Sequence, residues 1–280
     1  MLGKLFKRKS SPAAGDLPPE AGHEAGPEAS TDGDPMPDRP IYAIGDVHGC
    51  SDLLAHMLDV IDADADTHRP GAKTTLVLLG DYVDRGEDSA GVLTQLLGLA
   101  RSVPGNVAML MGNHERMMLD FLDDPSANGA LWLSNGGLQT LASFRIGGLT
   151  ENASEGALHN AADDLRRAMH ALDPSLETWL RGLPLSWVSG NVAFVHAAAD
   201  PAKDIADQSA ESLLWGNADF ARRARSDGLW CIHGHTVVAR PEVSGRRINI
   251  DTGACYSGAL SAIALTPGQT PRFLRAGTPS

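Results

Sequence analysis

Residues 41 to about 124 alternate between apolar runs and amphipathic segments, and this alternation constrains the fold of the 280-residue chain more than any other feature. Apolar runs that predict strands occupy 41–49, 73–81 and 105–115. Segments with helical spacing follow each run, at 51–63, 89–102 and 116–124. This β-α-β-α-β order predicts a largely parallel sheet covered by helices. Polar clusters follow the strands directly, where α/β sheets place their functional sites.

The second half of the chain predicts a helical insertion and then a β-rich region. Three weak helical patterns between about 121 and 190 favour an insertion that serves as a lid or as a wall of the substrate site. Further apolar runs predict strands at 191–197, 229–235, 246–254 and 259–265, with one helix over 209–224. The segment after Thr266 is expected to be loop.

The two ends of the chain differ in composition from the middle. Residues 1–40 are rich in Pro, Gly, Ala and acids, which favours a disordered arm. The basic start beside Leu2, Leu5 and Phe6 is too short for stable membrane anchoring, so we expect a solvated tail. We therefore predict an arm over 1–40, a domain over 41–268 with its insertion at about 121–190, and a C-terminal tail over 269–280.

Composition narrows the possible functions. The chain has 23 Lys and Arg against 35 Asp and Glu, and its net charge of −12 argues against sequence-blind binding of duplex nucleic acid. Only three cysteines are present, which argues against a disulfide scaffold and favours a reducing cytoplasm. No apolar run is long enough to predict a transmembrane helix, and no secretory signal follows the basic start.

Five polar clusters end predicted strands and together suggest a metal centre. Carboxylate, amide and imidazole groups of this kind are ligands for divalent metals. A carboxylate such as Asp81 can bridge two ions, and two neighbouring ions are the usual device for displacement at phosphorus. The clusters are Asp46-Val47-His48, Asp81 with Asp84-Arg85, Asn113-His114-Glu115, His196, and His233-Gly234-His235.

Three of these clusters carry a resemblance to a known family. GDVHG at 45–49, GDYVDRG at 80–86 and GNHE at 112–115 resemble the motifs of the phosphoprotein phosphatase branch of the calcineurin-like metallophosphoesterases. The likeness continues through LPLS, FVH, HGHT and DTGA and covers about residues 40–266. It implies an α/β fold in which a two-sheet β-sandwich is flanked by helices, with the helical insertion between.

The resemblance also implies a role for each matching residue. Asp46 and His48 match ligands of a first metal, and Asp81 matches the ligand shared by both metals. The ligands of the second metal are matched by Asn113, His196 and His235. His114 matches the general acid for the leaving oxygen, Asp84 the carboxylate that orients it, and Arg85 an arginine that binds the substrate phosphate. A water bridging the metals would attack phosphorus directly.

The sequence departs from the family pattern at one substrate contact. Many bacterial relatives have a second phosphate-binding arginine where this chain has Asn217. Arg116, Arg222 or Arg223 would have to substitute by geometry. This difference does not affect the positions that match metal ligands.

The leading hypothesis is a serine/threonine protein phosphatase with two divalent ions, with Mn²⁺ favoured over Fe or Zn²⁺. The alternative is a symmetrical bis(5'-nucleosyl)-tetraphosphatase, so the substrate is a phosphoprotein or a nucleotide. A more remote alternative is an inactive binding or scaffold homologue. Because His114 and all six ligand positions are present, the sequence favours an enzyme.

Overall fold

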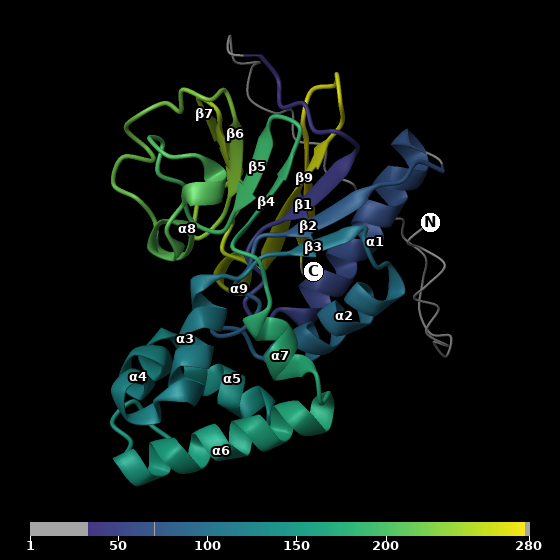
Figure 1. The fold of residues 1–280 in the computed structure, drawn as a ribbon. Helices are drawn as coiled ribbons and strands as arrows, with labels where there is room; N and C mark the ends of the chain where they lie inside the picture. The colour runs from purple at the N-terminus through teal and green to yellow at the C-terminus, as the bar shows by residue number, and fades with distance from the viewer. Residues whose placement is uncertain (1–32, 70, 278–280) are drawn as a thin grey trace, which may run out of the picture.

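The computed structural model describes residues 33–69 and 71–277. Two five-stranded sheets pack face to face, with strand orders β10-β9-β1-β2-β3 and β4-β5-β6-β8-β7. One apolar layer, which includes Ile41, Val77, Phe194 and Ile232, joins the sheets. Helices cover the first sheet, so the predicted α/β sandwich is confirmed (Figure 1).

The first sheet follows from the alternation in the sequence. Its parallel strands are β1 (Ile41–Ile44), β2 (Thr75–Leu78) and β3 (Val107–Met109), linked by α1 (Ser51–His68) and α2 (Ser89–Ser102). In β1, Ile41 faces the second sheet whereas Tyr42 faces the helices, as expected where successive side chains point to opposite faces. Both faces are therefore buried, which explains the nearly continuous apolar runs.

The end of the chain corrects one prediction, because the expected tail over 269–280 contains a strand. β10 (Arg272–Gly277) pairs antiparallel with β9 (Ala259–Leu265), which in turn pairs with β1. Phe273 packs between the sheets and Leu274 against the helical side, which is the alternation of a strand. A tight turn with Gly268 at φ 73° joins the two strands, so the prolines nearby end β9 without ending the sheet.

The second sheet carries the remaining site segments. It contains β4 (Ser186–Ser189), β5 (Val192–Val195), β6 (Trp230–His233), β7 (Glu242–Ser244) and β8 (Arg247–Asn249), with β5, β6 and β8 parallel. Short helices η2 (Ile205–Asp207), α8 (Ala210–Trp215) and α9 (Ala254–Ser257) lie in its connections. The helix predicted over 209–224 was too long: it ends at Trp215, because Gly216 turns the chain at φ 107°.

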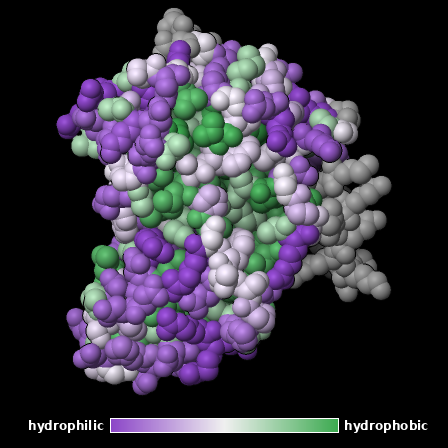
Figure 2. All heavy atoms as spheres, viewed as in Figure 1, coloured by the Kyte–Doolittle hydropathy of each residue, from purple (hydrophilic) through white to green (hydrophobic). Residues whose placement is uncertain are grey.

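The predicted helical insertion is present and forms a lobe beyond the sheets (Figure 1). It follows α3 (Asn113–Asp123), the helix predicted over 116–124, and its elements are α4 (Pro125–Trp132), η1 (Leu133–Gly137), α5 (Leu138–Ser143), α6 (Glu155–Leu172) and α7 (Leu176–Arg181). Leu158, Leu165 and Met169 form the buried stripe of α6, whereas its outer surface is hydrophilic (Figure 2). This amphipathic helix thus closes the lobe.

The predicted arm over 1–40 is described only from residue 33, so its first 32 residues lie outside the described part. Its last residues belong to the domain, contrary to the predicted boundary. The backbone N–H of Met36 donates to Asn191 Oδ1 at 2.5 Å, and that of Gly190 donates to Asp38 Oδ2 at 2.9 Å. Pro35 and Pro37 are buried. Within the described ranges, no helix is both long and apolar enough to cross a membrane.

Candidate metal centre

Several of the predicted site residues lie on loops with an unusual backbone, whereas Asn113 and His114 begin α3. Within residues 33–69 and 71–277, six non-glycine residues have positive φ, and five of these are predicted site residues. They are His48 (46°), Asp81 (52°), Asp84 (70°), Arg85 (66°) and His235 (68°). Side chains other than glycine rarely adopt this conformation, and such strain concentrates at functional sites.

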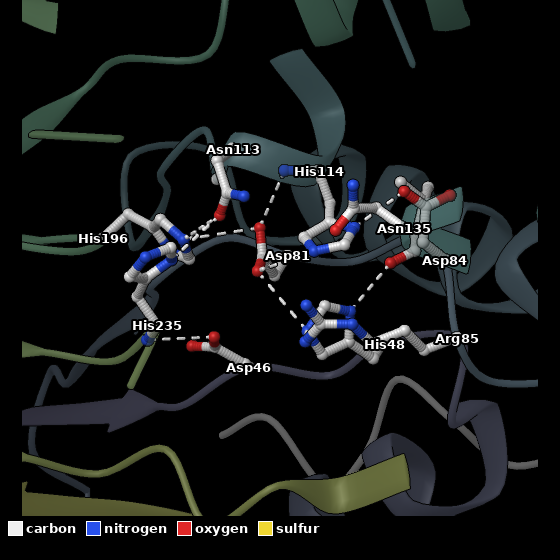
Figure 3. A network of polar contacts seen from close by, with 12 residues as sticks. Asp46, His48, Asp81, Asp84, Arg85, Asn113, His114, Asn135, His196 and His235 are labelled. Atoms are coloured by element: carbon white, nitrogen blue, oxygen red, sulfur yellow. Dashed lines mark hydrogen bonds and ion pairs between the residues drawn. The ribbon is translucent and has the colours of Figure 1, made fainter. Parts of the chain in front are cut away.

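Asp81 lies at the centre of the cluster (Figure 3). Its Oδ2 is 3.4 Å from His48 Nε2, and its Oδ1 is 3.4 Å from His196 Nε2. The two oxygens of one buried carboxylate therefore face two separate histidines. Gly112 allows this approach, because a Cβ at that position would lie 2.1 Å from Asp81 Oδ1.

The backbone fixes the tautomer of both histidines. The Nδ1 of His48 lies 3.0 Å from the carbonyl oxygen of Val83, and the Nδ1 of His196 lies 3.0 Å from that of Leu79. A carbonyl only accepts, so each Nδ1 carries the proton and each Nε2 presents a lone pair. Burial lowers the pKa of His48 to about 3 and that of His196 to about 4, which keeps both rings neutral as metal ligands require.

Acceptor atoms converge on the second half of the cluster. Asn113 Oδ1 lies 2.9 Å from His196 Nε2 and 3.0 Å from His235 Nδ1. Because His196 Nε2 has no proton, it and Asn113 Oδ1 are two acceptors at hydrogen-bond distance. A cation between them would satisfy both, and Asp81 Oδ1 adds negative charge on the same side. The ligand atoms of Asp81, His196 and His235 all lie within 4.8 Å of one another. These residues fit a divalent metal.

Asp46 completes the acidic side of the site. One of its oxygens accepts from the backbone N–H of His235 at 3.0 Å, whereas its buried Oδ1 has no hydrogen-bond partner among the described residues. Burial and the charges of Asp251 and Asp81 raise the pKa of Asp46 well above its usual range. Gly234 gives this oxygen room, since a Cβ there would lie 2.0 Å away. A buried carboxylate with one unpaired oxygen also fits a cation.

His114 and Asp84 form a buried pair beside the cluster. The Nδ1–H of His114 donates to Asp84 Oδ2 at 2.7 Å. Its buried Nε2, 3.9 Å from Asp81 Oδ2, has no hydrogen-bond partner in the described part of the chain. Burial lowers the pKa of His114, but the charge of Asp81 and the bond to Asp84 outweigh it, so the pKa is raised overall. The arrangement can hold a proton on the side that faces the cluster.

Arg85 lies at the open edge of this group. Its Nη1 donates to His48 Nε2 at 2.8 Å. That nitrogen has one lone pair, so the bond to Arg85 and a metal on His48 exclude each other. A metal on His48 would leave the guanidinium available for a substrate oxygen.

Glu115 joins the two loops that carry Asp81 and Asn113. It is fully buried and accepts backbone N–H groups of Gly112, Asp81, Tyr82 and Val83 at 2.7–3.2 Å. Glu115 is also the third residue of α3, so one carboxylate both supports the ligand loops from behind and lies at a helix start.

Asn217, expected at the phosphate-binding position, has a local structural role. Its Nδ2 donates to Ser212 Oγ at 3.3 Å, and its Oδ1 accepts from the backbone N–H of Asp219 at 2.9 Å. The side chain therefore holds the turn that follows α8. Among the described residues, its hydrogen bonds do not include the predicted metal ligands.

The helical insertion supplies site residues that the sequence analysis missed. Trp132 and Thr140 donate to Asp84, and the carbonyl oxygen of Gly136 accepts from the backbone N–H of Arg85. The adjacent glycines at 136 and 137, within a helical pattern, were the signal available in the sequence.

Comparison with known proteins agrees with this geometry. A bis(5'-nucleosyl)-tetraphosphatase [asymmetrical] of Geobacillus thermodenitrificans is 27% identical over 257 residues, covering 80% of this chain and 89% of the relative. Serine/threonine-protein phosphatase 2 of Salmonella typhimurium is 28% identical over 233 residues, covering 80% and 91%.

Solved structures share the fold. A protein serine/threonine phosphatase from Saccharomyces cerevisiae superimposes with a TM-score of 0.57 at 17% identity, covering 87% of this chain and 81% of that one. A protein-tyrosine phosphatase from Shewanella gives 0.54 at 18% identity, covering 88% and 85%. The family model described as calcineurin-like phosphoesterase matches residues 39–239. The chain therefore belongs to the calcineurin-like phosphoesterase family and is a metal-dependent phosphoric ester hydrolase.

Proposed function

We propose that the chain is a serine/threonine protein phosphatase with a dinuclear metal centre. Asp46, His48 and Asp81 would hold one ion, and Asp81, Asn113, His196 and His235 the other. The ions, when bound, supply Lewis-acid charge that activates water and neutralises the phosphate. The oxygen and imidazole donors with no thiolate suit Mn²⁺, which we propose as the metal.

The protein's own residues would bind the phosphate and deliver a proton. Arg85 presents a planar guanidinium that matches two phosphate oxygens. His114 holds a proton on Nε2 toward the cluster, and Asp84 fixes the opposite nitrogen at 2.7 Å. The imidazole can then protonate the departing oxygen as the bond to phosphorus breaks.

The His114–Asp84 pair is the observation that favours a phosphoprotein. Phosphoserine and phosphothreonine release an alkoxide, which is strongly basic and needs a proton in the transition state. Cleavage of a dinucleoside tetraphosphate releases a nucleotide, whose phosphate oxygen is a stable anion. A buried proton donor held by its own carboxylate therefore has most value for an alkyl phosphate.

The tetraphosphatase alternative is favoured by the relatives, several of which carry that name. A symmetrical bis(5'-nucleosyl)-tetraphosphatase of Aromatoleum aromaticum is 29% identical over 201 residues, and the asymmetrical enzyme above covers more of the chain. Symmetrical cleavage of diadenosine tetraphosphate gives two ADP, whereas asymmetrical cleavage gives ATP and AMP. Product analysis thus distinguishes the two forms.

The deciding experiment is turnover of a phosphoserine peptide and of diadenosine tetraphosphate side by side with added Mn²⁺. We expect the larger kcat/KM on the phosphopeptide. A larger kcat/KM on the dinucleotide would replace the protein-phosphatase proposal with the nucleotide one. We also propose a cytoplasmic location, because the sparse cysteines favour a reducing compartment.

A further inference from the structure

We propose that Trp132 and Thr140, both in the helical insertion, are positioning residues for the proton donor His114. They would act through Asp84, which neither metal group includes. This inference rests on the proposed general-acid role of His114. The insertion would then help to align the proton donor, in addition to forming a wall of the substrate site.

Thr140 fixes both the backbone and the side chain of Asp84. Its hydroxyl accepts from the Asp84 backbone N–H at 2.8 Å and donates to Asp84 Oδ1 at 2.7 Å. A threonine hydroxyl carries one proton, so the contact with Ser89 Oγ at 3.0 Å has Ser89 as donor. Thr140 thereby supports Asp84 in its left-handed conformation.

Trp132 holds the same carboxylate from a second direction. Its indole Nε1–H lies 3.1 Å from both oxygens of Asp84. The ring is fully buried and stacks on Phe121 of α3, with ring centroids 4.6 Å apart. This stacking keeps the indole N–H aimed at Asp84.

The carboxylate is thus held by three side-chain donors. Thr140 holds Oδ1 and Trp132 lies equally close to both oxygens, while Oδ2 accepts from the Nδ1–H of His114 at 2.7 Å. A carboxylate that could rotate would let the imidazole rotate with it. Proton transfer needs an aligned donor, because small misplacements of a catalytic group slow reactions strongly.

Two glycines allow the insertion to approach the site. Gly136 has φ 106°, and a Cβ there would lie 2.5 Å from the backbone nitrogen of Arg85. A Cβ on Gly137 would lie 2.5 Å from the Trp132 ring. The spacing of Trp132, the glycine pair and Thr140 therefore places both donors against the Asp84 loop.

The test compares two substrates whose leaving groups differ in basicity. Thr140→Val and Trp132→Phe should each lower kcat on a phosphoserine peptide by about tenfold or more, because they loosen the alignment of His114. On p-nitrophenyl phosphate, whose leaving group needs little protonation, the loss should be about twofold or less. KM and metal content should not change. Thr140→Ser keeps the hydroxyl and should restore most of the lost rate.

Matched controls separate alignment from folding. Thr75→Val alters another buried threonine, whose hydroxyl has no hydrogen-bond partner within the described ranges, and should leave both rates unchanged. Melting temperatures identify a variant that is merely unfolded. If Thr140→Val unfolds, Trp132→Phe and Thr140→Ser still carry the test.

A double variant distinguishes this inference from the proposed function. In a His114→Asn background, Thr140→Val should cause no further loss on phosphoserine, because the residue it aligns is gone. Equal losses on both substrates, or a full additional loss in the double variant, would overturn the positioning role. If His114→Asn itself slows both substrates equally, the general-acid proposal fails instead.

Discussion

The strand-end loops and the helical insertion contribute to the site in different ways. The loops after β1 and β2 carry His48, Asp81, Asp84 and Arg85, all in left-handed conformations. Two helices of the insertion begin with side-chain caps, Asp124 on α4 and Ser154 on α6, and the chain between α4 and α5 is kinked at Gly136. The insertion reaches the site through Trp132 and Thr140, which act on a loop residue. In the proposed function the loops would therefore present the acceptors to metal and substrate, and the insertion would keep one of them aligned.

The largest loss of activity should follow substitution of His114, which bonds to the loop residue Asp84 that the insertion holds. His114→Asn should slow phosphoserine hydrolysis by roughly 10²–10⁴-fold, or roughly 3–5 kcal/mol, but p-nitrophenyl phosphate hydrolysis distinctly less. Metal content should stay the same, since His114 is proposed as an acid. Loss of metal in the purified variant would show that His114 is a ligand, as its place in one cluster with His48 and Asp81 allows.

A change confined to the loops should remove metal and activity together. Asp81→Asn should lower turnover on every substrate by about 100-fold or more, because changes to outer partners of metal ligands alone cost 10–100-fold. Asp163→Asn, on the exposed face of α6, is the matched control and should change neither. The measurements are metal content by elemental analysis and kcat of the purified Asp81→Asn variant. Two tightly held ions at near-normal turnover would refute the role of Asp81 as a ligand shared by both metals.

A substitution at the contact between the regions should mainly cost stability and substrate binding. Gly136→Ala strains a residue at φ 106° and forces its Cβ toward the Arg85 backbone. We expect a lower free energy of unfolding by about 1–3 kcal/mol and a higher KM. Gly98→Ala in α2, where a Cβ has open space, should instead stabilise by up to about 1 kcal/mol. An unchanged KM in Gly136→Ala would show that substrate binding by Arg85 does not depend on its contact with the insertion.

The smallest change should follow removal of the residues before Arg39, which are remote from both the site loops and the insertion. A chain that begins at Arg39 lacks the bonds of Met36 and Asp38 to the β4–β5 turn, whereas one that begins at Asp34 retains them. We expect the shorter chain to be less stable by about 1–2 kcal/mol in denaturant unfolding, with the same kcat. Equal stability of the two chains would show that the folded domain begins at about residue 41, as the sequence predicted.

The sequence predicted which loop residues lie together because each of them is close in the chain to the end of a strand. Each predicted ligand directly follows or ends an apolar strand, and parallel strands bring such positions to one edge. Trp132 and Thr140 could not be found this way, since their partner Asp84 is 48 and 56 residues distant in the chain. β10 was missed because prolines masked its short alternation, and α8 was overextended because the turn at Gly216 lay inside a helical pattern.

In the proposed function, the loop residues hold two catalytic metal ions. The most direct test measures p-nitrophenyl phosphate turnover, metal content and melting temperature before chelation, after it, and after addition of Mn²⁺. We predict loss of turnover on chelation and recovery at about two ions per chain. The melting temperature should rise with metal, since a ligand at 100 times its Kd stabilises by about 2.7 kcal/mol. Full turnover in metal-free protein would show that catalysis does not depend on bound ions.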